Sequence, residues 1–472
     1  MHSPRLSLQI SERKTLLILM DGVLVNVAVL VALRLGAYRS GWAFTSEFLL
    51  SRFYWFLGLT ALYFILAPVN DCYNLRVASD VLSSAFALFK TTALMLVVYF
   101  CLYFLAEPRT LQLYWPRHIV GFYALVSVPL LSLWRWLYIV VFTAPQFRRR
   151  ALIVGAGWAG RTIVQAIRHN LSTDYEVVGF IDDDPSKQGQ TIEGIPVLGN
   201  HGNLVALAEE KGISEIVLAI TRDLKGDMFQ AIMDCNERGI QITPMPILYE
   251  QMTGRVAVEH VGDNWLVVLP VNGVSVFSLF MLFKRLADVI VSVLGLVLLS
   301  VVLPFVALAI YLESPGPIFY AQERVGRAGR IFRLIKLRSM IPSAEQDGQP
   351  RWARRNDERV TRVGRFLRRT RLDELPQFLN VLRGEMSLIG PRPERPEFVA
   401  ELQKRIPFYR SRLAVRPGLT GWAQVNYPYG SSVEDALIKL QYDLYYIKHQ
   451  SFYLDLLIFL KTIGVVLSFQ GT

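Results

Sequence analysis

The sequence predicts a membrane protein of mixed α and α/β class: four N-terminal transmembrane helices, a parallel-sheet domain, and a membrane-associated, mainly α-helical domain with a re-entrant helix. Of 472 residues, 52% are hydrophobic and 19% are charged, too apolar a balance for one water-soluble domain. A strand and a glycine-rich turn begin at Ala151, and 23 lysines and arginines against 11 acidic residues lie between Ile318 and Arg416. The predicted regions are 1–147, 148–270 and 271–472.

The overall charge favours an anionic partner. Lysine and arginine total 50 against 39 acidic residues, a net charge of +11 that suits a lipid headgroup, a nucleotide or a nucleic acid. Cys72, Cys101 and Cys235 form no C-x-x-C pair, and the six histidines are scattered. We therefore expect neither a disulfide scaffold nor a zinc site, and any metal should be bound by oxygen.

Four near-continuous apolar runs precede the parallel-sheet region, and each is close to the ~20 residues that a helix needs to cross the hydrocarbon core. These runs are Thr15–Leu33, Phe53–Val69, Val81–Leu105 and Ile119–Phe142. Arginines 148–150 follow the fourth run, so the positive-inside rule places that end, and by parity the N-terminus, in the cytoplasm. Asp21, Lys90 and Arg135 lie in or beside the spans; with no complementary set visible, helix packing or snorkelling is favoured over a transport path.

The segment ALIVGAGWAGRTIVQAIRHN, from Ala151, combines a buried strand, a turn with Gly155, Gly157 and Gly160, and an amphipathic helix. This G-x-G-x-x-G pattern predicts a Rossmann-like domain in which a pyrophosphate meets the helix N-terminus. Asp182 follows Gly160 by 22 residues, near the expected place of a ribose-binding acid. No proton-transfer pair such as Y-x-x-x-K accompanies the motif, so a regulatory or structural role is favoured over redox chemistry, and ligand binding stays open.

A fifth apolar run, Val289–Leu312, contains no charged residue and has the length of another crossing. A crossing would place the following basic region outside the cell. Pro304 removes a backbone hydrogen bond and kinks the helix, and Ser300 is close enough to satisfy a freed carbonyl. We therefore expect a re-entrant helix over about 282–312, with an ordinary kinked span as the alternative.

The basic region that follows, residues 313–450, is expected to hold the anion site. Arginine dominates it, and arginine suits a bidentate grip on phosphate. A nucleic-acid surface is the natural rival, but apolar stretches flank the region and no named nucleic-acid motif occurs in it. The stretch of about 452–469 is apolar but interrupted by Asp455 and Lys461, which indicates an interfacial helix.

Asp373 and Glu374 stand among several arginines of this region. Neighbouring helical positions point about 100° apart, so the two carboxylates cannot face each other as a paired acid and base. Because Pro376 is tolerated only in a first helical turn, Asp373 is predicted at or next to a helix N-cap, where the dipole and the arginines keep it ionised beside a bound phosphate. That arrangement suits nucleophilic attack on phosphorus, with Glu374 free to hold Mg²⁺; an N-cap aspartate with a surface salt bridge is the alternative.

Four ordered motifs extend over roughly residues 280–472: KRLADVIVS, ESPGPIFYAQERVGRAGRIFRLIKLRSM, RTRLDELPQFLNVLRGEMSLIGPRPE and RLAVRPGLTGWAQV. Together they resemble the bacterial sugar transferase family, the polyprenyl-phosphate hexose-1-phosphate transferases or monotopic phosphoglycosyl transferases. The preceding spans and nucleotide-type domain look like the large form of that family. The matched positions are the Asp-Glu dyad Asp373 and Glu374, the K-x-R-S-M residues Lys336, Arg338, Ser339 and Met340, and the P-R-P residues Pro391, Arg392 and Pro393.

The resemblance implies a function and a set of roles. Asp373 is the expected covalent nucleophile and Glu374 the expected Mg²⁺ ligand, while the nucleotide sugar is held by Lys336, Arg338, Arg392 and Arg416. The implied reaction moves a sugar 1-phosphate from a UDP-sugar to undecaprenyl phosphate and releases UMP, as the first membrane step of exopolysaccharide, capsule or O-antigen synthesis. The expected location is the bacterial inner membrane, multi-pass, with the catalytic domain facing the cytoplasm.

The expected partners are the UDP-sugar, the lipid acceptor and membrane lipid, but not nucleic acid. The oligomeric state stays open, with a homodimer as the candidate. Two other functions compete: a membrane-bound nucleotide-sugar dehydratase or epimerase that uses the glycine-rich domain, and a non-enzymatic scaffold or nucleic-acid tether. The identity of the sugar is not predicted, because these sugars differ by a few hydroxyl contacts.

Overall fold

The computed structural model describes residues 10–105, 117–142, 148–170, 174–220, 226–258, 279–342, 357–427, 430 and 432–467. The chain divides into two compact units, Met1–Thr253 and Gly254–Thr472. The predicted boundary at 270 lies outside the described residues. Val256 and Val258 already pack into the core of the second unit, which therefore begins before residue 271.

The first unit opens with helices, and the four predicted apolar ones are present as α1, α3, α5 and α6. The helices are α1 (Ile10–Ser40), α2 (Ser46–Leu50), α3 (Phe53–Leu66), α4 (Leu75–Ala78), α5 (Val81–Leu105) and α6 (Arg117–Phe142). By length and composition, α1, α5 and α6 are able to cross a membrane. Helix α3 has 14 residues. At 1.5 Å per residue it covers roughly 21 Å, less than the ~30 Å hydrocarbon core, so the predicted second span is shorter than a crossing.

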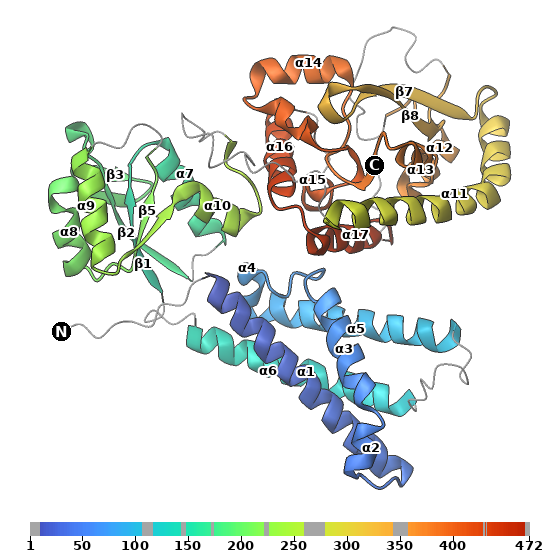
Figure 1. Ribbon diagram of the computed structural model, residues 1–472, viewed down its shortest axis with the longest axis horizontal. Helices are drawn as coiled ribbons and strands as arrows, with labels where there is room; N and C mark the ends of the chain where they lie inside the picture. Colours follow the sequence, from blue (N-terminus) through green and yellow to red (C-terminus); the bar gives the residue numbers. More distant parts are fainter. Residues whose placement is uncertain are drawn as a thin grey trace. The chain divides into compact units, whose positions relative to one another are not determined.

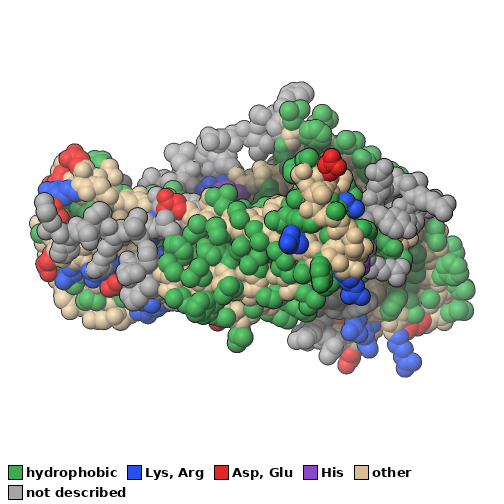
Figure 2. Space-filling view, turned by 90° about the horizontal axis from the view of Figure 1, so that it is seen from below, with side chains coloured by type: hydrophobic (Ala, Val, Ile, Leu, Met, Phe, Trp, Pro, Cys, Tyr) green, Lys and Arg blue, Asp and Glu red, His purple; other side chains and the backbone are tan. Residues whose placement is uncertain are grey.

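The outer faces of these helices are apolar. Leu19, Leu57, Leu82 and Leu125 are between 62% and 81% exposed. Figure 2 shows hydrophobic side chains gathered over much of the face that the N-terminal helices present, with few charged side chains among them. Exposed apolar area of this extent suits a lipid surrounding and is unusual on a water-soluble protein.

Inside the helices, Asp21 of α1 forms an ion pair with Arg135 of α6, with 2.6 Å between Oδ2 and Nη2. The hydroxyl of Tyr63 donates to the same carboxylate oxygen at 2.8 Å. The sequence does not reveal this pair, because Asp21 and Arg135 are 114 residues apart, and the ion pair between two helices agrees with the favoured interpretation that these residues serve helix packing. Lys90 is exposed, with Nζ 4.2 Å from the centroid of the Phe86 ring.

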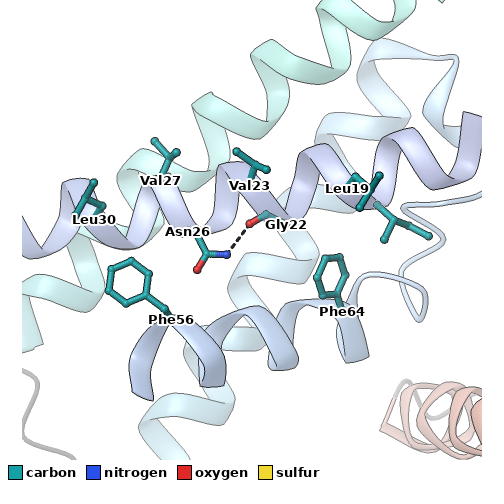
Figure 3. Close-up of a pocket in the computed structure, with 9 residues that line it drawn as sticks. Leu19, Gly22, Val23, Asn26, Val27, Leu30, Phe56 and Phe64 are labelled. Atoms are coloured by element: carbon teal, nitrogen blue, oxygen red, sulfur yellow. Dashed lines mark hydrogen bonds between the residues drawn. The ribbon is translucent and has the colours of Figure 1, made fainter. Parts of the chain in front are cut away.

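A groove of about 640 Å³ lies between α1 and α3, lined almost entirely by apolar side chains. Figure 3 shows Phe56 and Phe64 on the α3 side, opposite the α1 residues that surround Asn26. The Asn26 amide donates to the carbonyl of Gly22 at 2.7 Å and to the hydroxyl of Thr60 at 3.0 Å. Its polar amide is therefore satisfied within the helices, and no predicted site residue lines the groove.

The rest of the first unit is a six-stranded sheet flanked by helices. Its elements are β1 (Arg149–Val154), α7 (Trp158–Asn170), β2 (Tyr175–Ile181), β3 (Thr191–Ile192), β4 (Ile195–Gly199), α8 (His201–Glu210), β5 (Glu215–Leu218), α9 (Gly226–Glu237), β6 (Gln241–Pro244) and α10 (Met245–Thr253). The strand order is β3-β4-β2-β1-β5-β6, and only the β3–β4 pair is antiparallel. Helices α8 and α9 cover one face and α7 and α10 the other (Figure 1), which confirms the predicted doubly wound parallel sheet.

The second unit is mainly helical. Its elements are α11 (Leu279–Glu313), β7 (Phe319–Val325), β8 (Ile331–Leu337), α12 (Arg362–Thr370), α13 (Gln377–Arg383), β9 (Ser387–Ile389), α14 (Pro396–Arg405), β10 (Gly418–Thr420), α15 (Trp422–Asn426), α16 (Val433–Lys448) and α17 (Phe452–Leu467). Strands β7 and β8 form an antiparallel hairpin, and β9 and β10 form a short parallel pair. Helix α17 occupies the stretch predicted as interfacial, whose last two residues lie outside the described part.

Helix α11 is one continuous helix of 35 residues with Pro304 inside it. Figure 1 shows it as two segments that meet at a bend, as a proline in a helix predicts. The Ser300 hydroxyl donates to the carbonyl of Val297 at 2.7 Å. The carbonyl that Pro304 frees belongs to residue 300, so the expectation that the Ser300 side chain satisfies it is wrong.

Three charged residues near the start of α11 attach this helix to the elements that carry the candidate site. Lys284 donates to a carbonyl of β9 at 3.0 Å and to Asp455 of α17 at 2.7 Å. Arg285 donates to two carbonyls of the last turn of α13, at 2.7 and 2.8 Å, where a helix lacks internal donors. Asp288 is buried and accepts from a backbone N–H of β9 at 2.9 Å. The K-R-x-x-D pattern of the sequence is thus a set of anchors.

Candidate active site

Asp373 and Glu374 lie on a separate turn between α12 and α13. Arg371, in the left-handed conformation with φ of 59°, ends α12, and a single 3-10 turn, Leu372–Glu374, follows. The N-cap of α13 is Pro376. The prediction that Asp373 lies at or next to that cap is therefore wrong, because the left-handed residue begins a new turn before α13 starts. Both carboxylates are buried, with 5% and 7% of their surface exposed.

Three cationic side chains from three different segments surround the Glu374 carboxylate. Nζ of Lys336, on β8, lies 3.1 Å from Oε1, and Nη2 of Arg392, after β9, lies 2.9 Å from the same oxygen. Nη1 of Arg371, at the end of α12, lies 3.6 Å from Oε2. The structure therefore brings Lys336, Arg392 and the two carboxylates together, as the sequence predicts.

The two carboxylates differ in their electrostatic state. Burial alone would raise the pKa of Glu374, but Lys336, Arg392 and Arg371 outweigh it and hold that pKa well below its usual value. Burial likewise lowers the pKa of Lys336, and the negative charge of Glu374 opposes this shift. Glu374 is thus a fixed anion whose charge is balanced by the protein itself.

Asp373 has fewer interactions. Its Oδ1 atom is buried and accepts no hydrogen bond from the described residues. Burial raises the pKa of Asp373 to about 6, and the neighbouring charge of Glu374 adds to this shift while Lys336 opposes it. The sequence predicts that a helix dipole and the arginines keep Asp373 ionised; Arg368 and Arg371 do lower its pKa, but burial has the larger effect. At neutral pH the group is still mostly ionised, as a nucleophile requires.

Arg338 does not join this cluster. Strand β8 ends at Leu337, and the Arg338 guanidinium donates to the carbonyls of Ser314 and Pro315, just beyond the end of α11. Ser339 accepts from Nε of Arg368 at 2.9 Å. The K-x-R-S-M motif is therefore divided, with Lys336 at the carboxylates and the later residues in packing contacts.

Among the described residues, no hydrogen bond or ion pair joins Arg416 to Asp373 or Glu374. Burial lowers the pKa of its guanidinium, and the charges that act on it are those of Arg285, Arg327 and Asp288. Arg371, in contrast, was not predicted as a site residue. Its position three residues before Glu374, the spacing of neighbouring side chains on a helix, is the signal that identifies it.

The glycine-rich turn of the sheet domain is shaped for packing at two of its three glycines. Gly155 has φ of +108°, and a Cβ added there would lie 2.7 Å from the carbonyl oxygen of Ala219. A Cβ at Gly160 would collide with the carbonyl oxygen of Gly155, whereas the space at Gly157 is open. These contacts account for Gly155 and Gly160 without a ligand, but not for Gly157.

Asp182 has partners within the protein. Its Oδ2 accepts from the backbone N–H of Ala156 at 2.8 Å and lies 2.9 Å from Nζ of Lys187. The carboxylate that was expected to bind a ribose therefore accepts a hydrogen bond from a backbone N–H of the glycine-rich turn. This arrangement does not favour the dehydratase or epimerase function, which needs the turn for a dinucleotide.

No group of three or more His, Cys, Asp or Glu side chains suited to a metal occurs among the described residues. Mg²⁺ does not require one, because it is commonly held by one or two carboxylates together with substrate phosphates. The Oε2 atom of Glu374, whose ion-pair partner among the described residues is Arg371 at 3.6 Å, is an oxygen of that kind. The donor set therefore fits a magnesium ion completed by a diphosphate.

Long apolar helices, a doubly wound parallel sheet and a buried carboxylate pair with three cations beside Glu374 define a membrane protein with a buried, charged site. The bacterial sugar transferase family matches residues 279–469, and a CoA-binding domain family matches residues 68–246. The chain is 31% identical over 353 residues to UDP-glucose:undecaprenyl-phosphate glucose-1-phosphate transferase of Escherichia coli (strain K12), covering 71% of this chain and 75% of that protein. The chain belongs to the bacterial sugar transferase family.

Two further relatives show how far the likeness extends. A UDP-N-acetylgalactosamine-undecaprenyl-phosphate N-acetylgalactosaminephosphotransferase of Aeromonas hydrophila is 43% identical over 249 residues, 53% of this chain and 57% of that protein. A UDP-glucose:undecaprenyl-phosphate glucose-1-phosphate transferase of Xanthomonas campestris pv. campestris is 34% identical, and the match covers 66% of each chain. The chain thus matches 57% and 66% of the lengths of these two relatives. Among solved structures, UDP-D-quinovosamine 4-dehydrogenase from Vibrio fischeri is 22% identical, and the match covers 24% of this chain and 98% of that protein. Its TM-score is only 0.19.

Proposed function

We propose that this protein transfers a sugar 1-phosphate from a UDP-sugar to undecaprenyl phosphate and releases UMP. Membership of the bacterial sugar transferase family and the names of its relatives support this reaction class. The observation that carries the proposal is the unequal pair of buried carboxylates. Glu374 is balanced by three cations, whereas its neighbour Asp373 keeps a buried oxygen without a partner among the described residues.

In the first step, Oδ1 of Asp373 attacks the β-phosphorus of the UDP-sugar. A bond forms between this oxygen and phosphorus, the phosphoanhydride bond breaks, and UMP leaves with the bonding electron pair. Lys336 and Arg392, fixed beside Glu374, offset the negative charge that gathers on the phosphoryl oxygens. The sugar phosphate remains bound to Asp373 as an acyl phosphate.

In the second step, an oxygen of the undecaprenyl phosphate attacks the same phosphorus. The acyl-phosphate bond to Asp373 breaks, the polyprenyl-diphospho-sugar leaves, and the carboxylate is restored. When bound, Mg²⁺ held by Glu374 would add positive charge at the diphosphate. Because three cations of the protein balance the charge of Glu374, Asp373 is the reactive carboxylate of the two.

The membrane attachment suits a reaction between a water-soluble donor and a lipid acceptor, because one site must meet both. We propose that α11 enters and leaves the membrane on the same side, supported by Pro304, by the bend in the helix and by anchors such as Lys284 near its start. On this proposal the catalytic unit faces the cytoplasm of the bacterial inner membrane, where it begins the assembly of an exopolysaccharide, capsule or O-antigen. A homodimer stays a prediction.

The test uses the full chain in membranes with a panel of labelled UDP-sugars and undecaprenyl phosphate. We expect UMP release and label in the lipid extract with at least one sugar, and neither with D373N. The matched control is D227N, which changes an exposed aspartate at the start of α9 and should retain the wild-type rate. Normal UMP release by D373N would contradict the proposed function.

A further inference from the structure

The loop that carries Arg392 is held through its backbone. Four consecutive carbonyl oxygens, those of residues 391–394, each accept a hydrogen bond from a residue that is distant in sequence, and two of these donor residues are neighbours on β7. The donors, in that order, are N–H of Gly418, Nη2 of Arg412, Nη1 of Arg324 and N–H of Val325, at 2.9, 2.9, 3.1 and 2.9 Å. The two prolines of the loop fix their own φ angles. The backbone around Arg392 therefore has little freedom to move.

Arg412 is the residue that holds the carbonyl of Arg392 itself. Its guanidinium is buried, with 7% of the side chain exposed, and Nη2 lies 2.8 Å from Oδ2 of Asp443 on α16, which is 2% exposed. Nη1 donates to the hydroxyl of Tyr409 at 2.8 Å. The buried ion pair with Asp443 thus fixes the orientation of the Arg412 guanidinium. Because this group is planar and rigid, its N–H groups hold the carbonyl of Arg392 in one position.

Arg392 is the most exposed of the three cations that contact Glu374. Its side chain is 36% exposed, compared with 23% for Lys336 and 33% for Arg371. A long and partly exposed side chain keeps much rotamer freedom, so its aim depends on a fixed backbone. Because Arg392 both contacts Glu374 and is accessible from outside, it is placed to meet the incoming diphosphate.

We propose that Arg412, fixed by Asp443, is a positioning residue that aims Arg392 at Glu374 and at the diphosphate of the nucleotide sugar. This inference rests on the proposed function and adds to it a support that lies outside the site. Neither Arg412 nor Asp443 makes a described contact with Glu374. Arg412 acts on the loop through the carbonyl of Arg392 at 2.9 Å and, more weakly, through Oε1 of Glu394 at 4.0 Å.

The test is a double-mutant cycle in the full chain, read out as kcat/KM for the UDP-sugar at saturating undecaprenyl phosphate. D443N keeps the size of the side chain and weakens its hold on Arg412, and it is measured with Arg392 intact and in an R392Q background. With Arg392 intact we expect a loss of about tenfold, mainly as a raised KM for the UDP-sugar. In the R392Q background we expect a loss below about twofold, because the residue that Arg412 serves is gone.

R405Q is the control, since Arg405 is 59% exposed and pairs only with Glu401 on the same helix at 3.1 Å among the contacts described. With Arg392 intact its kcat/KM should equal that of the wild type, and in the R392Q background it should equal that of R392Q alone. Thermal unfolding of every variant is recorded, and the cycle is repeated with R412K, which decides the outcome if D443N does not fold.

Equal losses in both backgrounds would overturn the inference, because a purely structural role would weaken the enzyme whether or not Arg392 is present. If the wild-type chain releases no UMP from any UDP-sugar, the proposed function fails and the inference fails with it. If the wild type is active but the losses from D443N and R392Q are additive, only the inference about Arg412 fails and the proposed function stands.

Discussion

Nζ of Lys336 lies 3.1 Å from Oε1 of Glu374, so a strand residue and a turn residue 38 positions apart share a buried ion pair. The adjacent Asp373 carboxylate is also buried, and one of its oxygens has no hydrogen-bond partner among the described residues. Two neighbouring carboxylates with different environments can therefore take different roles, one as a fixed anion and one as a nucleophile.

The reaction should depend on the ionisation of Asp373. Because burial raises the pKa of Asp373 to about 6, its ionised form is nearly complete above neutral pH and is lost as the pH falls through 6. We expect kcat/KM to decrease about tenfold for each pH unit below the pKa of the nucleophile. Since the charge of Glu374 adds to the raised pKa, the residual activity of E374Q should show its midpoint at a lower pH than the wild type. The measurement is the initial rate of both enzymes between about pH 5 and 8, the range of the expected transition. A rate that does not change with pH in either enzyme would contradict this prediction.

Lys336 and Arg338 should differ in what their loss affects. K336M removes one of three cations from the Glu374 carboxylate, and Arg392 and Arg371 remain to balance its charge. We therefore expect about a hundredfold lower kcat with little change in thermal unfolding. R338M leaves the carbonyls of Ser314 and Pro315 without their donor and should cost about 1–3 kcal/mol of stability. Activity and thermal unfolding of the two variants, measured side by side, test this assignment. The opposite pattern would place Arg338 at the substrate.

The three glycines of the sheet domain should also respond differently. A methyl group at Gly160 meets the backbone carbonyl of Gly155, so G160A should lose about 1–3 kcal/mol of stability. The space at Gly157 is open, so G157A should stay within about 0.5 kcal/mol of the wild type. Thermal unfolding of both variants is the measurement, and equal effects would show that packing does not explain the motif.

The ion pair between Asp21 and Arg135 should stabilise the packing of α1 against α6. Removing one partner from a buried pair leaves an uncompensated charge, so D21N should cost about 3–5 kcal/mol. Replacing both residues by leucine should be milder than either single change, because no charge is then left buried. Thermal unfolding in detergent distinguishes these outcomes. If D21N unfolds at the wild-type temperature, the pair contributes nothing to the packing.

Sequence patterns predicted most of the architecture. Apolar runs located α1, α5 and α6, and the glycine turn located β1 and α7, because the periodicity that marks an element is local. They did not give the length of α3, which ends at Leu66 before a turn. The sequence patterns also predicted the bend of α11 at Pro304, but not that the Ser300 hydroxyl donates to the carbonyl of Val297.

Within the site, family motifs predicted Lys336, Arg392 and the two carboxylates, but not their electrostatics. Arg338 follows Lys336 at the spacing that places two strand residues on one face, yet the strand ends between them and the side chains separate. The raised pKa of Asp373 depends on burial by distant segments, which no local pattern reveals. The same limit applies to the Asp21–Arg135 pair.

The central claim is that Asp373 forms a covalent bond to the transferred phosphoryl group. The most direct measurement is mass spectrometry of the full chain mixed with UDP-sugar without lipid acceptor, quenched in acid and digested. We predict a peptide containing Asp373 that carries the mass of one sugar phosphate, absent from D373N and discharged when undecaprenyl phosphate is added. An enzyme that turns over its substrates while this peptide stays unmodified, or carries the label on another residue, would contradict the account.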